Sequence, residues 1–132
     1  MSIHVIVCSN RSELVDAASR VFDCAGFRLT VCECGLQAMA AAEVIDADLL
    51  ILDLETPGLD CLLMLAAIKE LAPALPVVAV STRPQVDARV VSHKGVSYVT
   101  LPSGSAGAME EVLVGLAQTE RSRFVSGSTL TQ

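Results

Sequence analysis

Asp53 is the residue whose surroundings most favour chemistry. It follows the apolar segment Asp48–Leu52, which predicts a strand buried on both faces. A carboxylate after such a strand lies at the edge of a parallel sheet where sites form, and it could act as a nucleophile toward a phosphoryl donor. An aspartate that only caps or fixes a loop is the other interpretation, and composition alone favours it.

Other polar or buried residues are expected at the same edge as Asp53, because each follows a predicted strand: Ser9, Asn10, Ser81 and Leu101. The strands are expected at residues 3–7, 27–32, 48–52, 77–80 and 97–100. The helices are expected at about residues 12–25, 36–45, 60–71, 84–93 and 109–116. A helix separates each pair of successive strands, as parallel neighbours require. The sequence therefore predicts a doubly wound α/β fold with a five-stranded parallel sheet and helices on both faces.

The bulk composition fits one domain, at residues 1–118, followed by a polar tail or linker at 119–132. The chain has 132 residues, of which 52 % are hydrophobic, and a mean hydropathy of +0.57. No apolar run reaches the ~18 residues of a membrane span, and the N-terminus lacks a signal-peptide pattern, so a cytoplasmic location is expected. A net charge of −6 with scattered basic residues argues against nucleic-acid binding by this segment.

Several enzyme classes lack their motifs in this sequence. It contains no Gly-x-Gly-x-x-Gly after the first strand, no Walker-type Gly-Lys-Ser/Thr and no Gly-x-Ser-x-Gly. The two histidines, His4 and His93, are interpreted as structural or solvated. The five cysteines have no zinc-type spacing and are interpreted as reduced thiols in or near the core. We expect no enzyme activity.

The segment around Asp53, Leu-Asp-Leu-Glu-Thr-Pro-Gly at residues 52–58, resembles the phosphoacceptor segment of response-regulator receiver domains of the flavodoxin-like, chemotaxis-regulator type. The resemblance extends from about Ile3 to Leu116. Segments 25–27, 33–35, 76–82 and 95–102 resemble turns and strands of the family in the same order. The resemblance implies the strand order 2-1-3-4-5, two-component signalling, Asp53 as phosphoacceptor and Ser81 as the hydroxyl that binds the phosphoryl group.

The chain departs from the family at three chemical positions. Ser9 and Asn10 replace the acidic pair after the first strand, and Leu101 replaces a lysine. A magnesium ion would be left with Asp53, the backbone carbonyl of Glu55 and water, so it is expected to bind weakly if at all. Leu101 supplies no cation for a moving phosphoryl group. The departures imply an atypical receiver that signals by protein–protein interaction, with weak or no magnesium-dependent phosphorylation.

Two alternatives stay open. One is a working phosphoacceptor with Asp53 as nucleophile, as the N-terminal part of a helix-turn-helix transcription regulator, because segment 122–127 resembles the linker of such regulators. The other is a small-molecule binder that uses the altered pocket at the strand ends. A titration with magnesium separates the first alternative from the atypical receiver.

Tyr98 resembles the family's switch aromatic, whose rotation is coupled to the hydroxyl at Ser81. The resemblance places the output face on the fourth helix, fifth strand and fifth helix. Mixed charges on these segments suit a protein partner; they are Arg83, Asp87, Arg89, His93 and Lys94. A histidine kinase and a second copy of the chain are the candidate partners.

Overall fold

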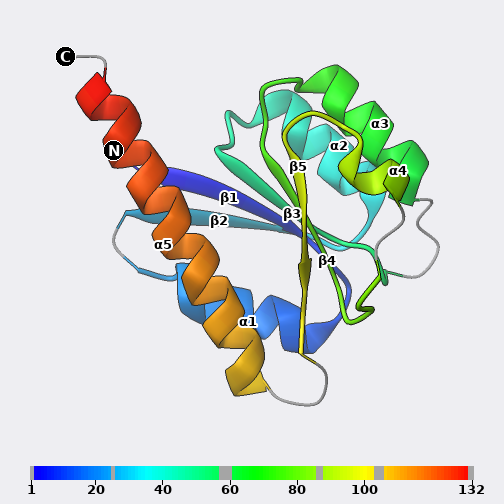
Figure 1. Cartoon of the computed structure of the whole chain (residues 1–132), viewed down its shortest axis with the longest axis horizontal. Helices are drawn as coiled ribbons and strands as arrows, with labels where there is room; N and C mark the ends of the chain where they lie inside the picture. Colours follow the sequence, from blue (N-terminus) through cyan, green and yellow to red (C-terminus); the bar gives the residue numbers. More distant parts are fainter. Residues whose placement is uncertain (1, 25, 57–60, 86–87, 103–105, 131–132) are drawn as a thin grey trace.

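The computed structural model of the chain describes residues 2–24, 26–56, 61–85, 88–102 and 106–130. Five strands form one parallel sheet in the order β2-β1-β3-β4-β5 (Figure 1). The strands are β1 (Ile3–Cys8), β2 (Phe27–Cys32), β3 (Leu49–Asp53), β4 (Val77–Ser81) and β5 (Val96–Thr100). The predicted fold class and strand order are confirmed.

The helices cover both faces of the sheet. They are α1 (Ser12–Phe22), α2 (Gly35–Val44), α3 (Cys61–Leu71), α4 (Ala88–Val91) and α5 (Ala106–Leu130). Figure 1 shows α1 and α5 on one face and α2, α3 and α4 on the other. Each helix makes the crossover that joins two parallel strands, or follows the last strand.

Every residue of β3 and β4 is buried, and alternate residues supply two separate cores. One core lies under α1 and α5 and includes Leu49 and Ile51, while the other lies under α2 and α3 and includes Leu50 and Leu52. The same alternation directs the side chain of Asp53 toward the face covered by α1. Both faces of β3, the strand that ends at Asp53, are therefore packed against a hydrophobic core.

The fourth helix is shorter than predicted. A helix over residues 84–93 is expected from the sequence, whereas α4 contains four residues, Ala88–Val91. Val90 and Val91 are β-branched and lose side-chain freedom in a helix, which lowers their helix propensity. The chain then turns at Gly95, whose φ of +79° lies in the region that favours glycine.

The last helix is longer than predicted. A polar tail is expected from Thr119, whereas α5 continues to Leu130. Two contacts within this part support the helix: the Thr119 hydroxyl donates to the carbonyl of Gly115 at 2.9 Å, and the Arg121 guanidinium lies 4.9 Å from the centre of the Phe27 ring. Glu120 is also buried. A polar tail and the exposed face of a helix contain the same kinds of residue, so the residue pattern does not distinguish them.

Residues 57 and 58 of the segment that resembles the phosphoacceptor segment lie outside the described residues, as do the expected start of the third helix at residue 60 and Asp87 of the output face. Within the described part of the chain, no helix combines the length and hydropathy needed to cross a membrane.

Candidate functional site

The carboxyl ends of four strands bring most of the predicted site residues together. Asp53 ends β3, Ser81 ends β4, Ser9 follows β1 directly and Leu101 follows β5. The side chains of these four residues are buried, with Asp53 and Ser9 wholly inaccessible to solvent. Asn10 is exposed. The pair expected to replace the family's two acids is therefore split between the interior and the surface.

The side chain that contacts Asp53 most extensively is Arg11, which the sequence analysis did not select. Its Nε donates to Oδ2 of Asp53 at 2.8 Å and its Nη2 donates to Oδ1 at 3.1 Å. Two parallel N–H bonds from one guanidinium to one carboxylate form the strongest common type of ion pair. Asp53 is thus paired with a cation from its own chain.

Asp53 accepts two further hydrogen bonds. The Ser9 hydroxyl donates to Oδ2 at 2.7 Å, and the backbone N–H of Glu55 donates to Oδ1 at 2.9 Å. The Ser9 oxygen in turn accepts the backbone N–H of Arg11 at 3.0 Å. Both carboxylate oxygens are therefore engaged by donors, as a buried carboxylate requires.

Arg11 lies at the start of α1, a position that arginine rarely favours. It is the N-cap of α1 with extended backbone angles, and it makes no side-chain capping bond. A positive charge at a helix N-terminus also opposes the helix dipole. An unfavourable residue at a helix start near the strand ends suggests a role in a site. The ion pairs with Asp53 and Glu55 offset the unfavourable position of Arg11.

Glu55 extends the network to the next strand. Its Oε2 lies 3.0 Å from Nη1 of Arg11 and accepts the backbone N–H of Thr82 at 3.2 Å, while its Oε1 accepts the Thr82 hydroxyl at 2.7 Å. The Thr82 hydroxyl bond is the main cause that lowers the pKa of Glu55, and it outweighs the opposing effect of burial. The sequence suggested only the backbone carbonyl of Glu55 as a metal ligand, whereas in the structure its carboxylate contacts Arg11.

The charge state of Arg11 follows from the same contacts. Burial would lower its pKa, but the hydrogen bond to Asp53 and the charges of Asp53 and Glu55 outweigh burial and raise the pKa above its usual value. Arg11 therefore remains a cation.

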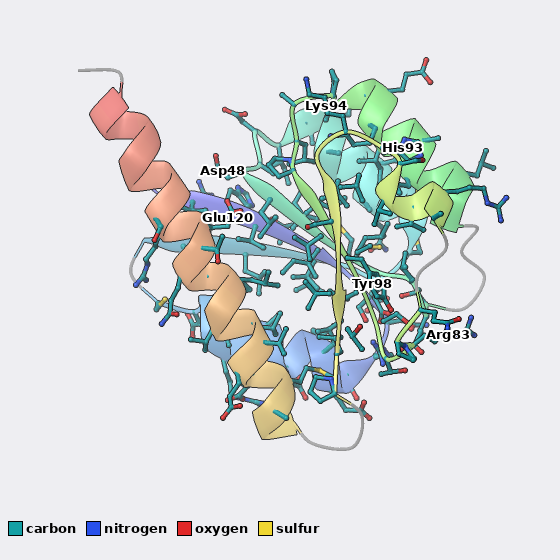
Figure 2. All side chains as sticks on the ribbon, viewed as in Figure 1. Asp48, Arg83, His93, Lys94, Tyr98 and Glu120 are labelled. Atoms are coloured by element: carbon teal, nitrogen blue, oxygen red, sulfur yellow. The ribbon has the colours of Figure 1, made fainter. Side chains whose placement is uncertain are left out.

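Ser81 and Tyr98 meet through the main chain of Arg83. The Ser81 hydroxyl accepts the Arg83 N–H at 3.1 Å, and the Tyr98 hydroxyl donates to the Arg83 carbonyl. Figure 2 shows Arg83 and Tyr98 close together, away from Lys94 at the other end of β5. Within the described residues, no hydrogen bond joins Ser81 to Asp53. Ser81 and Tyr98 are thus both bonded to the main chain of Arg83, while Arg11 and Ser9 contact Asp53.

Leu101 belongs to the hydrophobic core. Its side chain is 1 % exposed and packs in the core under α1 and α5, and its N–H donates to the Ser81 carbonyl at 2.7 Å. An apolar side chain fills the position where the resemblance implies a lysine.

The divalent metal implied by the resemblance does not fit this arrangement. Such a metal needs several hard oxygen ligands with a surplus of negative charge. Here the guanidinium of Arg11 takes both oxygens of Asp53 and one of Glu55. In the described parts of the chain, no three His, Cys, Asp or Glu side chains are grouped to hold a metal ion.

The other candidate features lie elsewhere. A groove of about 900 Å³ is lined by the first residues of β3, β4 and β5, at the opposite edge of the sheet from Asp53. His4 contacts Thr30 within the sheet, at 2.7 Å between Nε2 and Oγ1. Four cysteines have a described burial: Cys8 and Cys32 are buried, and Cys24 and Cys34 are exposed. The prediction of thiols in or near the core therefore holds for only some of them.

The sequence matches a known family over most of its length. The model of the response regulator receiver domain matches residues 5–103. The chain belongs to the response regulator receiver family. This receiver has the sheet order and helix arrangement that the resemblance implied.

Solved structures agree with the fold of this receiver. The response regulator domain of Thermotoga maritima CheB is similar with a TM-score of 0.78 and 22 % identity, over 92 % of this chain and 96 % of that one. The chemotaxis response regulator CheY4 of Vibrio cholerae has a TM-score of 0.72 and 14 % identity, over 86 % and 97 %. At these identities the likeness shows the fold.

A curated relative has a more similar sequence. The DNA-binding transcriptional regulator NtrC of Salmonella typhimurium is 33 % identical over 78 residues, which are 59 % of this chain and 17 % of that protein. The receiver therefore spans only a small part of the length of that relative.

Proposed function

We propose that this receiver is an atypical, non-enzymatic signalling module that works through protein–protein contacts, with weak or no magnesium-dependent phosphorylation of Asp53. The observation that supports the proposal is the bidentate ion pair between Arg11 and a fully buried Asp53. A nucleophile must present a free oxygen to its donor, and both oxygens of Asp53 are engaged.

The missing cation at position 101 supports the same proposal. Phosphoryl transfer depends mainly on positioning and on neutralisation of the moving charge. Loss of one such electrostatic contact costs about 10²–10³ in rate in other enzymes. Leu101 has an apolar side chain, which packs in the core and supplies no charge. The cation of Arg11 is paired with Asp53 and Glu55. Transfer to Asp53 would have to break that ion pair first.

We further propose that the output face comprises α4 with the β4–α4 loop before it, β5 and α5, in a cytoplasmic setting. Arg83 is exposed, and Tyr98 is tied to its carbonyl. His93 and Lys94 lie at the far end of β5 from Tyr98 (Figure 2). A protein with complementary charge, a histidine kinase or a second copy of the chain is the expected partner, and no DNA contact is proposed for this segment.

The test is incubation of the wild-type receiver with acetyl phosphate or phosphoramidate and magnesium, followed by intact mass measurement. We expect no stoichiometric phosphoryl adduct. Asp53→Asn is the matched control, because it removes the nucleophile but keeps the size of the side chain. A stable, stoichiometric adduct in the wild type that is lost in Asp53→Asn would contradict the proposal.

The second candidate function is a working phosphoacceptor in a longer transcription regulator. The retained Asp53 and Ser81 and the similarity to NtrC favour it. The adduct described above would support this candidate. We rank it second because it requires Arg11 to leave Asp53 before each transfer.

A further inference from the structure

The guanidinium of Arg11 contacts two neighbouring carboxylates, those of Asp53 and Glu55. Its three guanidinium nitrogens contact both oxygens of Asp53 and one oxygen of Glu55, at 2.8–3.1 Å. We propose that Arg11 is a tethered cation that takes the place of the family's divalent metal and hides a latent metal site formed by Asp53 and Glu55. This inference deepens the proposed function, on which it rests for the acceptor role of the site.

The charges of the described residues support this role. Asp53 has no exposed surface, and a buried carboxylate needs a compensating cation. Arg11 is the cation in contact with it, and the guanidinium side chain is only 22 % exposed. A planar fork is suited to a carboxylate pair of this kind, whereas a lysine would offer a single point charge.

The contacts also reproduce the linking action of a bound ion. Arg11 follows β1, Asp53 and Glu55 belong to the end of β3 and its loop, and Thr82 follows β4. Arg11 bridges the first two segments, and Glu55 carries the link to Thr82 through two hydrogen bonds. A network of side-chain contacts therefore links three loops, and the β4–α4 loop on the proposed output face is one of them.

A consequence distinguishes a tethered cation from an ordinary ion pair. Removal of the guanidinium leaves two neighbouring carboxylates and the Ser9 hydroxyl at one strand edge. Carboxylate and other oxygen ligands suit magnesium and calcium. The variant should therefore gain a response to divalent cations that the wild type lacks.

The test compares the melting temperature of the full chain in EDTA and in about 10 mM magnesium chloride. Wild type should melt at the same temperature in both. Arg11→Ala should melt lower than wild type in EDTA and rise by about 5 °C with magnesium, the shift expected when the free ion is about ten times its dissociation constant. Arg11→Ala combined with Glu55→Gln should lose the rise. Arg20→Ala, which removes an arginine from the exposed pair with Glu110, is the control and should show no rise.

Each outcome decides the inference. A magnesium-dependent rise in wild type as large as in Arg11→Ala overturns it, and so does an Arg11→Ala variant without any rise. If Arg11→Ala does not fold in EDTA, Arg11→Met, which keeps most of the side-chain volume, takes its place in the same comparison. A stoichiometric phosphoryl adduct formed by wild type with magnesium, without a magnesium-dependent rise in its melting temperature, would contradict the proposed function and leave the tethered cation standing. A magnesium-dependent rise in the melting temperature of wild type, without any phosphoryl adduct, would overturn the tethered cation and leave the proposed function standing.

Discussion

Arg11→Ala should lower the free energy of unfolding by about 3–4 kcal/mol at neutral pH in EDTA. Removal of one partner from a buried ion pair typically costs about 3–5 kcal/mol, because the other charge stays buried and uncompensated. Asp53 is that charge, since it has no exposed surface and its pair with Arg11 is bidentate. We choose the lower part of the range because Arg11 itself is partly exposed. Denaturant unfolding followed by circular dichroism measures the loss.

Arg20→Ala is the matched control for Arg11→Ala. Arg20 pairs with Glu110 on the surface, where its side chain is 53 % exposed. Exposed pairs of this type contribute about 0–1 kcal/mol. Equal losses in the two variants would show that Arg11 is an ordinary surface arginine.

Leu101→Ala should lower the free energy of unfolding by about 2–5 kcal/mol. Leu101 is 1 % exposed and packs with Leu14, Met109 and Leu113 in the core under α1 and α5. A buried leucine replaced by alanine loses its transfer free energy and leaves a cavity that the surroundings only partly fill. The same unfolding experiment measures the effect.

Leu36→Ala provides the comparison for Leu101→Ala, because Leu36 is 76 % exposed on α2. A surface substitution of this kind should change stability by less than about 0.5 kcal/mol. If Leu101→Ala were as mild, Leu101 would not be a core residue, and the position could still take a lysine without loss of packing.

The fold was predictable because its signals are local and repeated. Apolar runs such as Leu49–Leu52 and Val77–Val80 are typical of central strands of a parallel sheet, and Gly26 adopts a φ of +96° before β2. Helix ends were less predictable. α4 and α5 differ from expectation because their lengths depend on packing against the sheet and on loop geometry, which the residue pattern does not report.

The site was predictable only in part. Strand ends placed Ser9, Ser81 and Leu101 near Asp53, because the carboxyl ends of parallel strands meet at one edge. The sequence analysis missed Arg11, which lies one residue beyond the position of the family's acidic pair. The sequence did contain one indication of this role. Ser9 and Asn10 leave the acidic-pair positions uncharged, so the cation of Arg11 beside them can pair with the carboxylate of Asp53. Whether its side chain reaches Asp53 depends on the entry of α1, which only the structure shows.

The role of Glu55 was hidden for a similar reason. The sequence suggested only that the backbone carbonyl of Glu55 could be a ligand of magnesium. In the structure, the carboxylate of Glu55 contacts Arg11 and Thr82. Thr82 belongs to the loop after β4, 27 positions further along the chain. A contact of this range depends on how β3 and β4 pair, so the spacing of the residues alone could not have indicated it.

A double-mutant cycle measures the interaction between Arg11 and Asp53. The free energy of unfolding is measured in EDTA for wild type, Arg11→Ala, Asp53→Asn and the double variant. We predict that the double variant is more stable than the sum of the two single losses by about 2 kcal/mol or more, since no buried charge is left without a partner. Additive losses, within about 0.5 kcal/mol, would show that the two side chains do not interact and would contradict the account.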